Sequence, residues 1–182
     1  MILTFLRAEV DSPRFGELVQ RCLWMLRCNR TTIDNADLTD IQQNRIRKEL
    51  LGCFRGYGKD AYLFRGFPQD TKWRRVSLET ADLQRLLYAK EPSWIDFSDG
   101  TRLVSVGAKN ALGRPMGQGA IAVARAVREG ARLPPLIAAE SECGALIIVE
   151  GATRATAYML AQSSCVEAIV GTSTQMSRWA FY

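Results

Sequence analysis

The chain of 182 residues contains no histidine. This absence excludes acid–base catalysis by imidazole, Ser-His and Cys-His nucleophile pairs, and every zinc site that needs a histidine ligand. Any proton transfer would therefore fall to the side chains of Asp, Glu, Lys, Tyr or Cys.

Cysteine is scarce and scattered, with five residues and no C-x-x-C pair. An odd number without regular spacing predicts reduced thiols, as in a cytoplasmic protein, and not a disulfide framework. No stretch approaches roughly 18 uninterrupted apolar residues, so we expect no membrane-spanning helix. The segment from Met1 to Arg7 lacks the basic start and the long apolar run of a secretory signal peptide.

The balance of charge is mildly basic, with 24 Lys and Arg residues, 19 Asp and Glu residues and a net charge of +5. This charge favours anionic ligands but is too small for a surface that coats nucleic acid. Apolar residues make up 47% of the chain, which is enough for a sizeable core. The length fits one domain, or one domain with an extension.

The first half of the chain predicts a mostly helical extension. Apolar residues recur at the spacing of helices or alternate as in strands. The predicted elements are helices over 14–28, 40–54 and 78–89, strands over 62–67 and 73–78, and an extended segment over 94–97. The second helix carries a basic run that we interpret as a solvated face, formed by Arg45, Arg47, Lys48 and Arg55. We therefore predict an N-terminal extension over 1–93 and a separate domain over 94–182.

The second half mixes short apolar runs with helical patterns. The predicted elements are strands over 103–106, 136–140, 146–149 and 166–171, and helices over 120–130 and 152–161. Gly130 is placed to end the first of these helices in a left-handed conformation. This order predicts an α+β fold in which helices pack on a small sheet.

One strand–helix connection carries the strongest functional signal. The apolar run Leu146 to Val149 is followed by Glu150-Gly151, and good helix-forming sequence begins at Ala152. Free backbone N–H groups and the helix dipole favour an anion at such a helix start. Arg154 adds a guanidinium that can hold phosphate at two points, Thr153 adds a hydroxyl and Glu150 a carboxylate. The same residues are also compatible with an ordinary connection that carries a solvated arginine.

A second polar cluster, 98–102, lies before the predicted strand over 103–106. In the functional interpretation, the hydroxyl of Thr101 and the guanidinium of Arg102 bind the same anion as Arg154. The alternative is a simple turn that leads into a strand.

The order of elements from Ser98 to Gly171 resembles the ParB/sulfiredoxin superfamily. Its members share a helix that runs through Gly and Pro into a strand, followed by a hairpin strand that ends in Gly-x-x-Arg-x-x-Ala. Here that motif spans Gly151 to Ala157. The resemblance covers under half of the chain. It implies a ParB/sulfiredoxin-like fold that binds nucleotide phosphates at the helix start, through Gly151, Ala152, Thr153 and Arg154.

The chain departs from individual members of this superfamily within the motif. The reactive cysteine of sulfiredoxin corresponds to Ala152, which excludes that chemistry. The CTP-binding partition proteins have Glu and Arg in place of Ala152 and Thr153, and no helix-turn-helix follows here. A free serine kinase has two histidines at these positions, but its acidic residue is matched by Glu150. Gly151 and Arg154, the residues that hold phosphate, are kept throughout.

The resemblance implies a nucleotide-binding domain, and in its enzymatic form a small-molecule kinase or phosphotransferase. The nucleotide would be ATP, ADP or CTP, and Glu150 would act as a base or as a ligand of Mg²⁺. Phosphoryl transfer depends mostly on positioning and charge neutralisation, so the lack of histidine does not forbid it. Two other functions stay open: a non-catalytic ligand sensor or protein-interaction module, and a DNA-binding or nicking protein, which the net charge favours.

Overall fold

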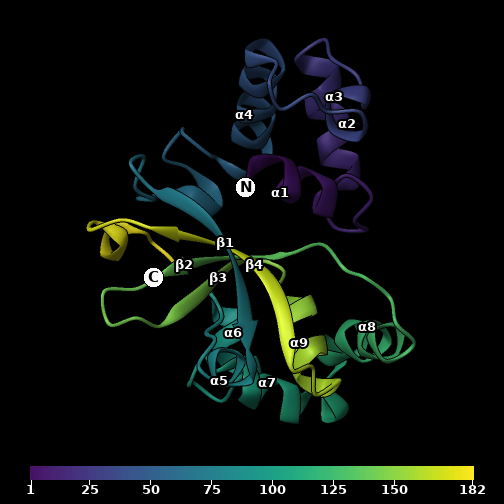
Figure 1. Ribbon diagram of the computed structural model, residues 1–182, viewed down its shortest axis with the longest axis vertical. Helices are drawn as coiled ribbons and strands as arrows, with labels where there is room; N and C mark the ends of the chain where they lie inside the picture. The colour runs from purple at the N-terminus through teal and green to yellow at the C-terminus, as the bar shows by residue number, and fades with distance from the viewer. The chain divides into compact units, whose positions relative to one another are not determined.

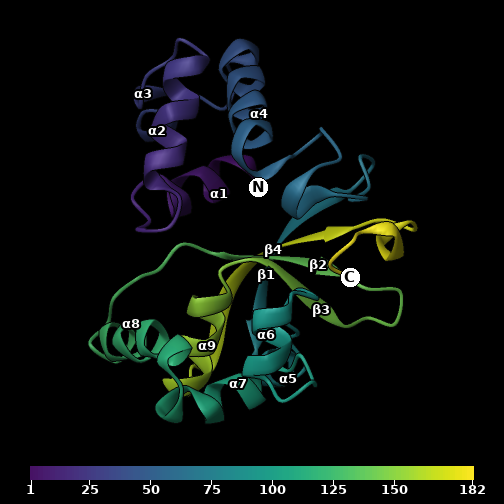
Figure 2. The same ribbon diagram turned by 180° about the vertical axis from the view of Figure 1, so that it is seen from behind.

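The computed structural model describes residues 1–182, which form two compact units, Met1–Gln69 and Asp70–Tyr182 (Figures 1 and 2). The chain therefore divides after Gln69 and not after residue 93 as expected. The physical reason is that β1 (Lys72–Glu79) pairs along its whole length with β4 (Cys165–Thr172). This long-range pairing makes residues 72–79 part of the second unit.

The first unit is helical. Its elements are α1 (Ile2–Glu9), α2 (Gly16–Met25), α3 (Thr31–Asp34), α4 (Ile41–Arg55) and the 3-10 helix η1 (Tyr62–Phe64). Local signals set the bounds of α4. The side chain of Asp40 accepts a hydrogen bond from the N–H of Gln43 at the start of the helix, and Gly56 ends it with φ +83°. The core of this unit includes Phe5, Leu6, Val19, Leu23, Leu50, Leu51 and Phe64.

Two predictions for the first unit are wrong. The segment 62–67 is not a strand, because Phe64 turns inward and its ring lies 4.9 Å from Tyr57 and 5.2 Å from Phe67, measured between centroids. The basic run of α4 is not uniformly solvated either. Arg47 is only 1% exposed, whereas Arg45 and Lys48 are exposed as expected.

The second unit has an α+β fold, as predicted. Its sheet has the strand order β1-β4-β2-β3, where β2 is Leu136–Glu140 and β3 is Leu146–Glu150. Strand β4 runs parallel to β2, and the other two pairs are antiparallel. One side of the sheet is covered by α5 (Thr80–Gln84), α6 (Pro92–Phe97), α7 (Val104–Asn110), α8 (Gln118–Arg128) and α9 (Ala152–Leu160) (Figures 1 and 2). None of the helices is both long and apolar enough to cross a bilayer.

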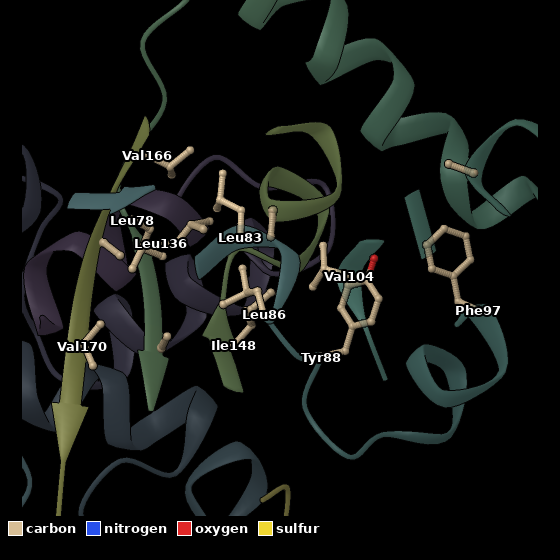
Figure 3. Close-up of a cluster of buried hydrophobic side chains, with 14 residues drawn as sticks. Leu78, Leu83, Leu86, Tyr88, Phe97, Val104, Leu136, Ile148, Val166 and Val170 are labelled. Carbon is tan, nitrogen blue, oxygen red and sulfur yellow. The ribbon is translucent and has the colours of Figure 1, made fainter. Parts of the chain in front are cut away.

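The core of the second unit lies between the sheet and these helices. Figure 3 shows the inward side chains of the strands, among them Leu136 and Val170, facing Leu86 and Tyr88. The hydroxyl of Tyr88 is hydrogen-bonded to Oγ1 of Thr156 at 2.6 Å inside this core. Burial raises the pKa of Tyr88 to about 12, although this hydrogen bond lowers it. The contact fixes α9 against the segment that follows α5.

Several helix and strand predictions for this unit are wrong for identifiable reasons. Residues 94–97 belong to α6, which begins at Pro92, a favoured first helical residue. Residues 104–106 begin α7, and only Leu103 makes a bridge, to Leu87. The predicted helix over 78–89 shortens to α5, because Leu87 exchanges backbone hydrogen bonds of 2.8 Å with β3. The other predicted elements are confirmed, including Gly130 with φ +91° after α8.

All five cysteines are free thiols, as predicted. A hydrogen bond with Ser141 lowers the pKa of the exposed Cys143, whereas burial raises the pKa of Cys22 to about 12. The thiolate reacts, so N-ethylmaleimide should modify Cys143 first as pH rises and Cys22 last in the folded protein. Mass spectrometry against time tests this order. After denaturation without a reductant all five should react, and two blocked thiols would contradict the prediction.

Candidate anion site at the start of helix α9

Gly151 forms the joint between β3 and α9. Its φ of +101° lies in the left-handed region that favours glycine. A Cβ atom at this position would lie 2.8 Å from Nη2 of Arg154 and 2.9 Å from Cδ2 of Leu136. The joint therefore needs glycine twice, for its backbone conformation and for the space beside its α-carbon. This confirms the predicted place of Gly151 at the strand–helix connection.

The first turn of α9 presents free backbone donors. The N–H of Ala155 donates to the carbonyl oxygen of Gly151 at 2.8 Å, which is the first hydrogen bond of the helix. The N–H groups of Ala152, Thr153 and Arg154 precede it and have no acceptor within the helix. No side chain caps this end, and Thr153 is exposed. These donors lie at the positive end of the helix dipole.

Arg154 lies in the first turn, as predicted, and folds back over Gly151. Its Nη2 atom is 3.6 Å from Oε1 of Glu150 and 3.5 Å from the carbonyl oxygen of Pro135. Both distances are long for hydrogen bonds of a guanidinium. The side chain is 14% exposed, and its buried Nε has no hydrogen-bond acceptor. A buried donor without an acceptor costs about 1–3 kcal/mol, so this guanidinium is able to gain from a further acceptor.

Glu150 ends β3 with its carboxylate facing Arg154, and its side chain is 16% exposed. It was predicted as a base or a metal ligand. No group of three His, Cys, Asp or Glu side chains suited to a metal ion occurs in the structure. A metal at Glu150 would therefore have to take its remaining ligands from water and from the bound molecule, as Mg²⁺ commonly does with phosphates.

Helix α8 packs beside α9 (Figure 1). At their ends, Nη2 of Arg128 donates to the carbonyl oxygen of Leu160 at 2.6 Å. Near their starts, a Cβ atom on Gly119 would lie 3.6 Å from the methyl group of Thr153. The positive ends of both helix dipoles therefore meet beside the candidate site. Gly119 lies in the first turn of α8 and permits this close packing because it has no side chain. The helix predicted over 120–130 begins one residue too late to include it.

The side chains of Arg102 and Thr101, predicted to bind the same anion as Arg154, have partners elsewhere in the chain. The guanidinium of Arg102 donates to the carbonyl oxygens of Tyr88, Tyr182 and Phe181, at 3.0, 3.1 and 3.4 Å. Burial lowers its pKa. The hydroxyl of Thr101 donates to the carbonyl oxygen of Ser98 at 2.7 Å. Both side chains thus hold the local chain and the C-terminal segment in place.

Tyr158 and the carbonyl of Pro135 belong to the surroundings of Arg154, and neither is among the residues predicted for the site. Tyr158 lies one turn after Arg154 on α9, and its pKa is raised by burial and lowered by the charge of Arg154. The i, i+4 spacing on the predicted helix was a usable signal for Tyr158. No sequence signal indicates the carbonyl of Pro135, because the pairing of β2 with β3 brings it close to Arg154.

The joint thus combines three free N–H groups, an incompletely hydrogen-bonded arginine and a glycine that lets the two come together. Comparisons of the chain with protein-family models, with curated proteins and with solved structures found no match. The evidence for a function therefore lies in the geometry of the residues themselves.

Proposed function

We propose that this protein binds the phosphate groups of a nucleotide at the β3–α9 joint. The observation that carries the proposal is the guanidinium of Arg154, which is 14% exposed, has only long contacts through Nη2 and lies next to a helix start with free N–H groups. Phosphate oxygens are strong acceptors that suit both kinds of donor. The order helix, strand, strand, helix over 118–160 supports the resemblance to ParB-like nucleotide-binding domains.

In this proposal the backbone N–H groups of Ala152, Thr153 and Arg154 hold one phosphate. The guanidinium of Arg154 holds the same phosphate or its neighbour with two donors, which a lysine ammonium cannot reproduce. The hydroxyl of the exposed Thr153 is available as a further donor. ATP, ADP and CTP all carry the required phosphates, so this geometry does not select among their bases.

Glu150 determines whether Mg²⁺ strengthens or weakens the binding of phosphate at this site. Its carboxylate lies 3.6 Å from Arg154, where it would repel a bare phosphate and attract one that carries Mg²⁺. From the same position it would accept the proton of an acceptor hydroxyl that attacks the terminal phosphorus of ATP, while the bond from that phosphorus to the bridging oxygen breaks and ADP leaves. This step would make the protein a small-molecule phosphotransferase. Binding without turnover would make it a nucleotide sensor. The five free thiols support the cytoplasm as its compartment.

Titration of a fluorescent ATP analogue against four variants tests the site. Arg154→Ala should weaken binding roughly 10- to 150-fold, because one bidentate charge-assisted contact is lost. Arg154→Lys should recover part of the affinity. Glu150→Gln should strengthen binding without metal, because the carboxylate that repels a bare phosphate is neutralised, and should abolish the dependence on Mg²⁺. Arg125→Ala, which removes the same charge from an exposed position on α8, should have little effect.

Each result has a distinct meaning. If the wild type binds neither ATP nor CTP analogues, the proposed function is wrong. If Arg154→Ala and Arg125→Ala bind as tightly as the wild type, the nucleotide lies elsewhere. If binding depends on Arg154 but no phosphate transfer to a hydroxyl acceptor or to water occurs with Mg²⁺, the sensor replaces the phosphotransferase.

A further inference from the structure

A cavity of about 600 Å³ lies at the other end of β2 from the candidate anion site. Strands β2 and β3 are antiparallel, so Ile137 is paired with Glu150, whereas Glu140 is paired with Leu146. The cavity adjoins Glu140 and is therefore separate from Arg154. It is lined by Asp70, Lys72, Glu140, Ser141, Glu142, Thr172, Ser173 and Thr174.

The cavity opens at the carboxyl ends of two neighbouring parallel strands. Strand β2 ends at Glu140 and β4 ends at Thr172, and the register of their pairing puts both ends on the same edge of the sheet. From there the chain leaves β2 toward β3, while residues 173–182 leave β4. A crevice between chains that diverge from parallel strands is a recurrent ligand site in open sheets.

The lining has many hydrogen-bond acceptors and an excess of negative charge. The lining residues carry three carboxylates, four hydroxyls and a single ammonium group, that of Lys72. The carboxylates are only partly used by the protein: Oδ1 of Asp70 accepts from Ser173, Oε1 of Glu142 from Ser177, and Oε2 of Glu140 from Arg74. The remaining lone pairs favour a ligand that is cationic and rich in donors. This preference opposes the net charge of +5 of the whole chain.

The walls of the cavity are held in place by the protein itself. The side chain of Ser141 is buried, and its hydroxyl accepts a hydrogen bond from the N–H of Ala145 at 2.9 Å. The N–H of Glu142 donates to the hydroxyl of Tyr182 at 3.1 Å. Because these bonds fix the turn after β2, little ordering remains to be done when a ligand binds.

The carboxylates are spread around the cavity and do not converge. They do not form a group of three that is suited to a metal ion. Separate carboxylates suit separate donors on one organic molecule better than a single ion. We propose that this cavity binds a small organic amine that carries hydroxyl groups or further amino groups. Its ammonium group would lie between Asp70 and Glu142, and its other donors would face the hydroxyls of residues 172–174.

Three amines of increasing size serve as probes with the full chain: ethanolamine, glucosamine and spermidine. Binding is followed by calorimetry and by the amide NMR shifts of residues 172–174. At least one amine should bind, and N-acetylglucosamine, which has no positive charge, should not. Asp70→Asn and Glu142→Gln should each weaken binding, by roughly 10- to 150-fold where a charge-assisted hydrogen bond is lost. Lys72→Met should strengthen it, because a like charge is removed.

Two matched controls separate this site from general electrostatics and from the nucleotide site. Glu129→Gln removes one negative charge from an exposed position after α8 and should leave amine binding unchanged. Arg154→Ala should also leave it unchanged. The proposal is overturned if none of the three amines binds, if N-acetylglucosamine binds as well as glucosamine, or if Glu129→Gln weakens binding as much as Glu142→Gln.

Discussion

Arg47→Ala is expected to lower the free energy of unfolding of the first unit by about 3–5 kcal/mol. The side chain is 1% exposed. Its Nη1 atom donates to the carbonyl oxygen of Thr32 at 3.0 Å, and its Nη2 atom donates to that of Asp37 at 2.7 Å. The same two nitrogens contact the amide oxygens of Gln43 and Asn44, at 3.1 and 2.6 Å. One guanidinium thus ties the chain before α4 to the helix itself.

The substitution would leave these acceptors without a donor and open a cavity beside α4. Urea denaturation of the full chain measures the loss, and hydrogen exchange of the α4 amides places it in the first unit. Arg45→Ala removes the same charge from an exposed position on the same helix and should change stability by less than about 0.5 kcal/mol. Arg47→Met keeps much of the volume of the side chain, so its loss of stability should lie between those of Arg47→Ala and Arg45→Ala. Equal stability of the Arg45 and Arg47 variants would refute this role.

The role of Arg47 also shows where sequence reasoning stops. Arg45, Arg47 and Lys48 look alike in the sequence, and a basic run on a helix usually faces solvent. The difference arises because α3 and the segment that follows it supply carbonyl acceptors to one side of α4, from Thr32 and from Asp37. No local pattern specifies where an irregular segment places its carbonyl groups.

Elements with two independent local signals were predicted correctly. Helix α4 has apolar periodicity and a capping Asp40, and α8 has periodicity and Gly130. Segments with a short apolar run alone were ambiguous between helix and strand. Residues 103–106 are the example: they have β-branched side chains, yet only Leu103 finds a strand-like partner, and the chain continues as α7.

The residues of the candidate anion site that are close together in the sequence were predictable. Glu150, Gly151 and Arg154 lie within five residues, so the strand–helix connection alone brings them together. The partners of Thr101 and Arg102 were not predictable in this way, because the positions of these residues depend on a left-handed conformation at Arg102 and on contacts with the C-terminal segment. The cavity at the end of β2 had a signal that was not used: polar clusters directly follow the strands that end at Glu140 and Thr172.

Gly151→Ala is expected to lower the free energy of unfolding of the second unit by about 2–5 kcal/mol. A left-handed conformation costs a residue with a Cβ atom about 1–2 kcal/mol. Crowding against Arg154 and Leu136, at 2.8 and 2.9 Å, adds about 1–3 kcal/mol, as in an overpacked core. Gly130→Ala is the matched control, because Gly130 has φ +91° with nothing within 4 Å of the added Cβ. It should show only the conformational cost.

A double-mutant cycle with Arg154→Ala separates the two sources of crowding. If the guanidinium of Arg154 lies on Gly151 in solution, Gly151→Ala should cost less stability in the Arg154→Ala background than in the wild type. The stability loss that remains in the Arg154→Ala background then comes from the backbone conformation of residue 151 and from its contact with Leu136. Gly151→Ala alone should also weaken nucleotide binding, because the guanidinium must move from its place beside the helix start. If Gly151→Ala and Gly130→Ala are equally destabilising and the cycle shows no coupling, Arg154 does not lie over the joint, and the phosphate site loses its main support.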